Sequence, residues 1–539
     1  MSEDITTPVL IAGGGPVGMT LALELARYGV RSVLVERNPS TTSHPKMDLT
    51  NGRSMELFHR LGLAEKLRDV GVPRDNCFDI SWITTLAGHE LHRFTYPSAN
   101  GARAEIAERN DGSQASQPPL RVSQIVIEPV LKTAIDANPL IDVRFGTAFE
   151  KLIEQDDDGV TSQVRGADGI VTRVRSRFLA GCDGGGSAVR RDLGIELEGD
   201  FNVASAYMVH FRSTARDILQ RWGIAWHYQS GIGTLIAQND KDTWTLQRWI
   251  LPGMDPAAMH PEQVLEEWVG TKFEYEILQA NPWSAHFVVA ESYGRGRVAL
   301  AGDAAHQFVP TGGYGMNSGI ADAIGLAWVL TARLEGWGGG QLLEAYDRER
   351  RPTAWWHLAA SRRHMGVRME IGGVYAEAGA LEGEGAEARR VAAGEKIAAL
   401  GNIENESWGV ELGYRYDDSP VICGEPNPPA VDPVTYRPST CPGARLPHVF
   451  LEPGAALHDR LGKYFTLIAL GDVDASAIEA AAKDRRMPLA VLRLARPDLR
   501  TIYERDLLLV RPDHHVAWRG DALPDDVDTL LAKVTGAVD

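Results

Sequence analysis

The chain has 539 residues, of which 44% are hydrophobic and 24% are charged, and its formal net charge is -17. This length exceeds what one hydrophobic core usually serves and indicates two or three domains. The acidic excess argues against nucleic acid or an anionic membrane as a partner, because both carry negative charge. The absence of any run of roughly eighteen apolar residues argues against a membrane-spanning helix.

The N-terminal sequence and the cysteines favour a soluble, cytoplasmic protein. Residues 1–15 lack a basic start and a small-residue cleavage site, so no secretion signal is expected. The cysteines Cys77, Cys182, Cys423 and Cys441 form neither a CxxC pair nor a Cys/His metal pattern. Free thiols in a reducing compartment, and no metal site, are therefore expected.

The first sixty residues contain a dinucleotide-binding pattern. Apolar residues 8–12 predict a strand, and residues 17–27 show helical spacing. The turn between them fits GxGxxG, whose glycines permit a tight bend, approach of backbone to pyrophosphate, and close packing of helix on strand. A second predicted strand, 32–35, ends in Glu36, which can accept hydrogen bonds from ribose hydroxyls. The predicted contacts here are Gly13, Gly15, Pro16, Val17, Gly18, Glu36 and Arg37.

Two further glycine-rich elements follow predicted strands. Residues 178–190 contain Asp183 and three glycines after an apolar run, and residues 297–306 end a second run in Gly302 and Asp303. Residues 310–317 then bend into a predicted helix, 318–333. An aspartate at a strand end can bind a ribityl hydroxyl, and a helix N-terminus suits the electron-rich edge of a flavin.

In order and spacing, these three elements resemble the class A flavoprotein aromatic hydroxylases, typified by para-hydroxybenzoate hydroxylase. The similarity covers about residues 5–365, and residues 509–519 resemble the tail of phenol hydroxylases. The resemblance implies an α/β fold with a Rossmann-like FAD-binding domain, an inserted mixed-sheet substrate domain and a thioredoxin-like C-terminal domain. We expect FAD binding from residues 1–75, 116–185 and 290–400, the sheet from 76–115 and 186–289, a linker at 401–445, and the last domain at 446–539.

The same resemblance assigns roles to individual positions. It places Glu36 on the adenosine ribose, Arg53 on the pyrophosphate and Gln124 on the flavin side. Asp303 would bind the ribityl chain, and Asp183 would serve FAD and the nicotinamide indirectly. The residues expected along the bend and the isoalloxazine are Gly302, Pro310, Gly313, Gly315, Met316 and Asn317. Two alternatives stay open: Arg53 as a surface cation at a helix start, and Gln124 as an ordinary helix-cap residue.

Hydroxylation by dioxygen, which the resemblance implies, requires a cofactor, because protein side chains alone do not activate dioxygen. His306, His514 and His515 have no second ligand at a metal-binding spacing. The resemblance implies that reduced flavin adds oxygen at C4a and that the hydroperoxide hydroxylates an electron-rich ring. No second strand-GxGxxG-helix unit occurs, so NADPH or NADH is expected to visit transiently as reductant.

The substrate residues are the least constrained. Asp48 occupies the place where some relatives carry a histidine base, and we expect a base or an orienting acid; the alternative is a backbone contact or a pair with Lys46. Alternating aromatic and polar residues at 226–228 and 243–249 predict strands with one covered face. His227, Tyr228 and Arg248 are candidates for substrate contact, although each could instead only pack the sheet.

Taken together, the sequence predicts an FAD-dependent NAD(P)H monooxygenase that hydroxylates a small phenolic compound. A flavin halogenase is excluded because no WxWxIP segment occurs. Baeyer-Villiger oxidation, modification of a polyketide antibiotic and a non-catalytic flavoprotein remain open alternatives. Cys441 precedes Pro-Gly-Ala, which favours a structural or dimer-contact role over thiol redox, and a homodimer is one of the assemblies left open.

Overall fold

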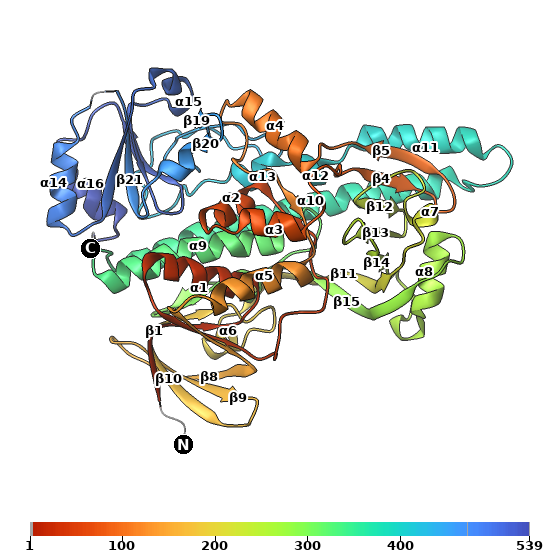
Figure 1. The fold of residues 1–539 in the computed structure, drawn as a ribbon, viewed down its shortest axis with the longest axis horizontal. Coiled ribbons are helices and arrows are strands. Elements are labelled where there is room, and N and C mark those ends of the chain that lie inside the picture. Colours follow the sequence, from red (N-terminus) through yellow and green to blue (C-terminus); the bar gives the residue numbers. More distant parts are fainter. Residues whose placement is uncertain (1–3, 472, 538–539) are drawn as a thin grey trace.

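The computed structural model describes residues 4–471 and 473–537, which form three connected parts (Figure 1). The first part is a sheet of order β16-β17-β10-β1-β2-β7, in which β17, β10, β1, β2 and β7 run parallel, while β8 and β9 continue from β10. Its strands are β1 (Ile5–Ala12), β2 (Ser32–Glu36), β7 (Ile141–Phe145), β8 (Thr147–Gln155), β9 (Val160–Gly166), β10 (Val171–Gly181), β16 (Gly294–Arg295) and β17 (Val298–Leu300).

Helices cover this sheet because its central strands are apolar on both faces, as a parallel sheet requires. Figure 1 shows α9, α1 and α5 together on one side of β1 and β10. Pro16 opens α1, where its fixed φ suits the first turn, and Gly29 ends it with a φ of 90°. The helices of this part are α1 (Pro16–Tyr28), α2 (Gly52–Arg60), α3 (Ala64–Val70), α5 (Gln124–Asp136), α6 (Ala188–Asp192), α9 (Tyr314–Glu335) and α10 (Leu342–Ala378), with the 3-10 turn η2 (Gly302–Ala304) and the short pair β3 (Leu49–Thr50) and β6 (Leu120–Arg121).

The second part is a mixed sheet of order β18-β15-β11-β14-β13-β12-β4-β5. Its strands are β4 (Ile80–Ile83), β5 (Glu90–Phe94), β11 (Leu197–Arg212), β12 (His227–Ser230), β13 (Gly233–Ala237), β14 (Thr243–Trp249), β15 (Glu276–Ala290) and β18 (His306–Gln307). Its helices are α4 (Ala99–Arg109), α7 (Arg216–Leu219), η1 (Pro256–Ala258) and α8 (Pro261–Val269). Because β18 lies only a few residues beyond β17, the first and second sheets are joined next to the third glycine-rich turn.

The two faces of the mixed sheet differ in character. One face packs Tyr228, Leu235 and Leu246 against Leu265 and Trp268 of α8 in a compact apolar cluster. Since side chains alternate along a strand, the neighbouring residues of β12, β13 and β14 lie on the opposite face. That face is polar: His227 contacts Asp48 of the first part, and Thr234 accepts a hydrogen bond from Arg368 of α10. We call it the inner face.

The third part contains a four-stranded sheet of order β22-β21-β23-β24, parallel between β21 and β22 and antiparallel elsewhere. The helix α14 connects the parallel pair and α16 follows the last strand, which is the thioredoxin-like arrangement predicted from the sequence. Its elements are β19 (Phe450–Glu452), β20 (Ala455–Ala456), η3 (Leu457–Arg460), β21 (Phe465–Leu470), α14 (Ser476–Asp484), β22 (Leu489–Leu494), η4 (Pro497–Leu499), α15 (Arg500–Tyr503), β23 (Leu507–Val510), β24 (Val516–Gly520) and α16 (Val527–Val534). The predicted α/β fold class is therefore confirmed.

The segment 401–445, predicted as an extended linker, is more ordered than expected. It follows α11 (Ala386–Leu400) and contains α12 (Ile403–Glu406) and α13 (Trp408–Leu412). Val410, Leu412 and Tyr416 are almost fully buried. Burial of these apolar side chains against the first part stabilises the segment, whereas residues 413–445, which include the proline-rich run, contain no helix or strand.

Among residues 4–471 and 473–537, no helix is long and apolar enough to cross a membrane. Within the same residues, no group of three or more His, Cys, Asp or Glu side chains is arranged to hold a metal ion.

Candidate functional site

A cavity of about 710 Å3 lies where the three glycine-rich turns meet at the carboxyl ends of β1, β10 and β17. The N-terminus of α9 forms another wall, and residues 283–286 of β15 close it from the second sheet. The predicted cofactor residues that line it are Gly13, Gly15, Pro16, Val17, Glu36, Arg37, Gln124, Asp183, Asp303, Pro310, Gly313, Gly315 and Met316. Elements about 300 residues apart in sequence thus converge on one cavity, as expected for the ligand site of a doubly wound sheet.

One end of the cavity is formed by the turn between β1 and α1. Gly13 has a φ of 113°, and a Cβ there would lie 2.1 Å from the carbonyl oxygen of Cys182. Gly15 is the N-cap of α1 and makes no side-chain cap hydrogen bond, so the first N–H groups of the helix stay open toward the cavity. At Gly18 a Cβ would lie 2.0 Å from the Gly13 oxygen, which agrees with the close helix-strand packing predicted there.

Glu36 ends β2 beside this turn. Its Oε2 accepts a hydrogen bond from the Gly14 N–H at 2.8 Å, and its Oε1 accepts from the backbone and side chain of Asn38 at 2.9 and 2.7 Å. These donors fix the carboxylate at the cavity wall, and its remaining lone pairs can receive two adjacent ribose hydroxyls.

The opposite end is built by the turn after β17 and by the start of α9. Asp303 is solvent-exposed and lines the cavity, whereas Gly302 is buried with a φ of 63° behind it. The N-cap of α9 is Gly313, with a φ of 68° and no side-chain cap. Open N–H groups and the positive end of the α9 dipole therefore face the part of the cavity lined by Gly315 and Met316.

These features fit FAD. A cavity with one uncapped helix N-terminus at each end offers donors for a pyrophosphate and for the pyrimidine edge of a flavin. The two acidic side chains, Glu36 and Asp303, stand where ribose and ribityl hydroxyls need acceptors. The glycines admit a cofactor backbone that larger side chains would obstruct.

We predict that Gly15→Ala mainly weakens FAD binding, whereas Gly13→Ala mainly destabilises the apoprotein. No heavy atom lies within 4 Å of a Cβ at Gly15, so Gly15→Ala should leave apoprotein stability within about 0.5 kcal/mol and lower FAD affinity at least about tenfold. Gly13→Ala should destabilise the apoprotein by at least about 2 kcal/mol, because the φ of 113° and the Cys182 contact both oppose a side chain. Urea unfolding measures the stability of each apoprotein, and titration with FAD measures its affinity. Equal stability of the two variants would contradict the steric role assigned to Gly13.

Arg53 and Asn317 are not among the residues that line the cavity. Arg53 is buried in α2 and donates to Glu56 at 3.2 Å and to the Asp513 carbonyl at 2.7 Å. Its burial excludes the surface cation, and its guanidinium reaches the third part of the chain, so a contact with the pyrophosphate stays a prediction. The Asn317 side chain accepts from Asn51 N–H and donates to the Leu49 and Gly313 carbonyls, so it braces the bend against β3.

Gln124 and Asp183 line the cavity but are also bound to the protein. Gln124 Nε2 donates to Glu128 at 2.6 Å, and its backbone N–H donates to the Met47 carbonyl. Asp183 accepts from Ser187 Oγ at 2.5 Å and from the Ala188 N–H at 2.7 Å, at the start of α6. Their direct contact with a cofactor stays a prediction.

Asp48 lies at the meeting point of the first part and the inner face. Its Oδ2 accepts three hydrogen bonds, from Trp226 Nε1 at 2.5 Å, His227 Nε2 at 2.8 Å and Arg121 Nη1 at 3.3 Å. Within the described residues Oδ1 accepts none. His227 and Arg121 lower the pKa of Asp48 far below its usual range despite burial, so the carboxylate is ionised. The side chain of Asp48 therefore binds three other side chains, and neither a pair with Lys46 nor a contact with backbone only, the two alternatives considered above, describes it.

Of the three substrate candidates, only His227 lies on the inner face. Burial lowers the pKa of His227, and a neutral ring donates its Nε2–H to Asp48. Tyr228 points into the apolar cluster beneath α8, and its hydroxyl donates to the Gly223 carbonyl. Arg248 shares the face of Leu246, two residues away, and donates to the carbonyls of Ile232 and Trp249. Tyr228 and Arg248 therefore lie on the face of the sheet opposite Asp48, and their contact with a substrate stays a prediction.

Sequence reasoning missed the side chains that complete this polar region. Arg121 links Asp48 to Asn405 of α12 by a 2.9 Å hydrogen bond. Arg368 of α10 pairs with Glu404, which also accepts from the N–H of Gly312 in the glycine-rich bend. Both links involve the segment 401–445, which is distant in sequence from Arg121 and Arg368, so no local pattern pointed to them.

Comparison with known proteins agrees with this geometry. The FAD binding domain family matches residues 6–361, and the aromatic-ring hydroxylase C-terminal family matches residues 439–538. The chain is 38% identical to the FAD-dependent monooxygenase apdD of Emericella nidulans, over 98% of this chain and 90% of that protein. It is 31% identical to the 2,4-dichlorophenol 6-monooxygenase of Cupriavidus pinatubonensis, over 98% and 95% of the two chains.

Solved structures extend the similarity to the whole fold. The rebeccamycin biosynthetic enzyme RebC with reduced flavin superposes with a TM-score of 0.89 at 33% identity, covering 99% of this chain and 100% of RebC. The flavin-dependent monooxygenase PieE, in complex with FAD and substrate, gives 0.89 at 30% identity and covers both chains completely. A likeness of this extent includes the cavity, the mixed sheet and the C-terminal part.

Proposed function

Because the chain belongs to the family of FAD-dependent aromatic-ring hydroxylases, we propose that it uses NADPH or NADH and dioxygen to hydroxylate a phenolic ring. Its relatives support a phenolic substrate, since they include a dichlorophenol, a nitrocatechol and a phenol monooxygenase. Others are polyketide hydroxylases, so the ring can belong to a larger fused system.

The observation that carries this proposal is that Oδ1 of Asp48 accepts no hydrogen bond from residues 4–471 or 473–537. Three donors hold Oδ2, and the side chain is 16% exposed, so the second oxygen is available to a hydroxyl group. A phenol that donates its O–H to Oδ1 would have its ring orientation fixed by a rigid carboxylate. Because Asp48 follows Met47, which lines the cofactor cavity, the ring would lie next to the flavin end of that cavity.

The inner face would complete the substrate site. Trp283 of β15 lines the cavity and donates its Nε1–H to Gln247 at 2.8 Å, which ties an aromatic wall to the sheet. Gln229 is buried and its Nε2 has no partner among the described residues, so it remains a donor for a second polar group on the substrate. Aromatic walls with a few fixed polar groups are typical of sites for small ring compounds.

FAD, when bound, supplies the oxygen-activating chemistry, and the protein side chains supply orientation and charge. With its pKa far below the usual range, the Asp48 carboxylate is too weak a base to remove a phenolic proton completely. It can accept the hydrogen bond and increase electron density on the ring oxygen. Arg121 balances the charge of Asp48, and the hydrogen bond from the neutral ring of His227 adds to the stability of the ionised form inside a region that excludes most water.

The decisive experiment is a screen of simple and fused phenols for stimulated oxidation of NADPH and NADH. A substrate should yield a product that gains one oxygen atom, and mass spectrometry should show that the atom comes from labelled dioxygen. Product NMR should show a new aromatic hydroxyl; an ester formed from a ketone would indicate Baeyer-Villiger oxidation instead. A label that comes only from water, or no stimulation by any phenol, refutes the proposed function.

A further inference from the structure

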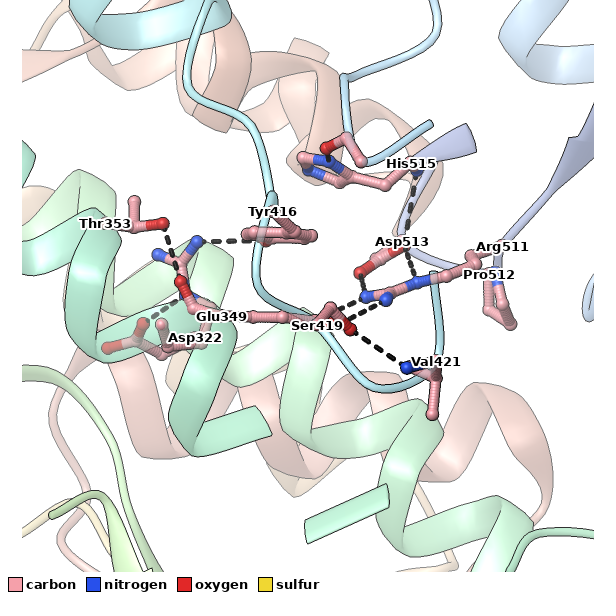
Figure 2. A network of polar contacts seen from close by, with 12 residues as sticks. Asp322, Glu349, Thr353, Tyr416, Ser419, Val421, Arg511, Pro512, Asp513 and His515 are labelled. Carbon is pink, nitrogen blue, oxygen red and sulfur yellow. Dashed lines mark hydrogen bonds and ion pairs between the residues drawn. The ribbon is translucent and has the colours of Figure 1, made fainter. Parts of the chain in front are cut away.

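The third part of the chain contributes no residue to the lining of the cofactor cavity. Nevertheless two buried arginine ion pairs connect it to the turn that carries Asp303, through adjacent residues of α10 (Figure 2). We propose that this connection positions the cofactor turn, so that the C-terminal domain determines how tightly FAD is held. The proposal requires FAD binding but does not require phenol hydroxylation.

The inner end of the connection is Asp322 of α9. Its Oδ2 accepts the N–H of Gly302 at 3.0 Å and the Nε2–H of His306 at 2.9 Å. These two residues flank Asp303, the exposed acid of the cavity. Asp322 is buried, and Arg350 with His306 lowers its pKa to about 2, so it acts as a charged acceptor. The carboxylate of Asp322 thus holds both sides of the turn that presents Asp303.

Arg350 of α10 binds this carboxylate, and its other N–H groups donate hydrogen bonds to two further residues. Its Nε donates to Asp322 Oδ1 at 2.7 Å, and one terminal nitrogen donates to the Ser318 carbonyl at 3.3 Å. The other donates to the hydroxyl of Tyr416 at 3.1 Å. Because a buried guanidinium is stable only with its donors satisfied, the orientation of Arg350 depends on Tyr416.

The outer end lies in the C-terminal domain. Arg511 donates to the two oxygens of Glu349 at 2.5 and 2.7 Å and also contacts Asp513. Figure 2 shows Tyr416 between the two ion pairs, beside His515. The Tyr416 ring stacks on His515 at 4.1 Å, and the Arg511 guanidinium lies 5.3 Å from its centre. Tyr416 therefore contacts the C-terminal domain with its ring and Arg350 with its hydroxyl.

Tyr416→Phe tests the connection with the smallest change, because it removes the hydroxyl and keeps the stacked ring. We expect the FAD dissociation constant of the apoprotein to rise about fivefold, the effect of about one hydrogen bond. The matched control is Tyr464→Phe, which removes a hydroxyl bonded to Glu335 of α9 at 2.9 Å, also across the boundary of the C-terminal domain. The control should bind FAD as the unaltered chain does, and urea unfolding of both apoproteins reports any general loss of stability.

A double-mutant cycle with Asp322→Asn shows whether Tyr416 acts through Asp322. Asp322→Asn keeps an acceptor for Gly302 but removes the charge that binds Arg350, so it should itself weaken FAD binding at least about tenfold. The double variant should bind FAD no more weakly than Asp322→Asn alone. Additive effects, an unchanged dissociation constant in Tyr416→Phe, or an equal rise in the Tyr464→Phe control would each overturn the proposal. Since FAD binding is measured without substrate, these results are independent of the proposed hydroxylation.

Discussion

Replacing Asp48 by alanine should lower the kcat/KM for phenol hydroxylation by about 100-fold, while FAD remains bound. A reactant that is misplaced by about 1 Å typically loses about this much in rate. Asp48 is not among the residues that line the cofactor cavity, so the purified variant should keep its flavin absorbance. Steady-state kinetics together with the flavin content of the same preparation checks both parts of the expectation.

The type of failure distinguishes orientation from folding. If Asp48 orients the ring, Asp48→Ala should still oxidise NADPH or NADH in the presence of phenol but release hydrogen peroxide in place of hydroxylated product. Asp48→Asn keeps an acceptor oxygen without the charge, so its yield of hydroxylated product per NADPH or NADH oxidised should lie between those of Asp48→Ala and the unaltered chain. Tyr275→Phe serves as the control, because Tyr275 packs against the apolar cluster beneath α8, on the face of the sheet opposite Asp48, and its hydroxyl donates to Glu266. Normal coupling in Asp48→Ala would contradict an orienting role.

Short-range patterns were sufficient for the cofactor end of the molecule. The turn at Gly13 and the acid at Glu36 are each set by a strand, a bend and a helix that are neighbours in sequence. Their geometry follows from backbone sterics and from the ends of parallel strands. To predict that this turn lies close to Asp303, only the strand order of a doubly wound sheet was needed in addition.

Contacts between segments that lie far apart in the sequence were not predicted. Arg53 begins a helix much as a phosphate ligand could, but its partner is a carbonyl 460 residues further along the chain. No local pattern in the sequence reveals such a partner. Arg121 was missed for the same reason, since its contacts with Asp48 and Asn405 depend on the packing of three separate segments.

The face of the sheet on which Arg248 lies follows from alternation alone. Trp244 and Leu246 have the same parity as Arg248, and they are the apolar side of β14. Thr245 and Gln247 have the other parity, which the structure places on the inner face with His227. A strict reading of period two therefore places Gln247, and not Arg248, on the same face as His227.

Acid should destabilise this protein before most of its carboxylates are protonated. Desolvation by burial lowers the pKa of several histidines from 6.5, to about 3 for His357 and His515 and to about 4 for His364 and His448. Between these values and 6.5 the unfolded chain binds protons that the folded chain does not. The free energy of unfolding therefore falls as the pH decreases through 6.5.

The expected size is large compared with a typical folding free energy. From pH 7 to pH 5.5, each of the four histidines loses somewhat more than about 1 kcal/mol, or about 5 kcal/mol together. Glu411 opposes this trend: burial raises its pKa to about 8, so between pH 7 and pH 5.5 the folded chain holds a proton that the unfolded chain lacks, which returns about 2 kcal/mol. For these five groups together, a net loss of about 3 kcal/mol is a substantial fraction of the roughly 5–15 kcal/mol that stabilises most domains.

Urea unfolding of the holoenzyme at pH 7 and pH 5.5 measures this loss, and His448→Gln isolates one contributor. His448 is buried among Glu56, Arg445 and Asp459, and neither of its ring nitrogens has a hydrogen-bond partner within the described residues. Glutamine cannot titrate, so the variant should lose about 1 kcal/mol less than the unaltered chain over the same pH interval. A stability that stays constant or rises toward pH 5.5 would mean that these histidines take up protons in the folded state, and hence that water reaches them.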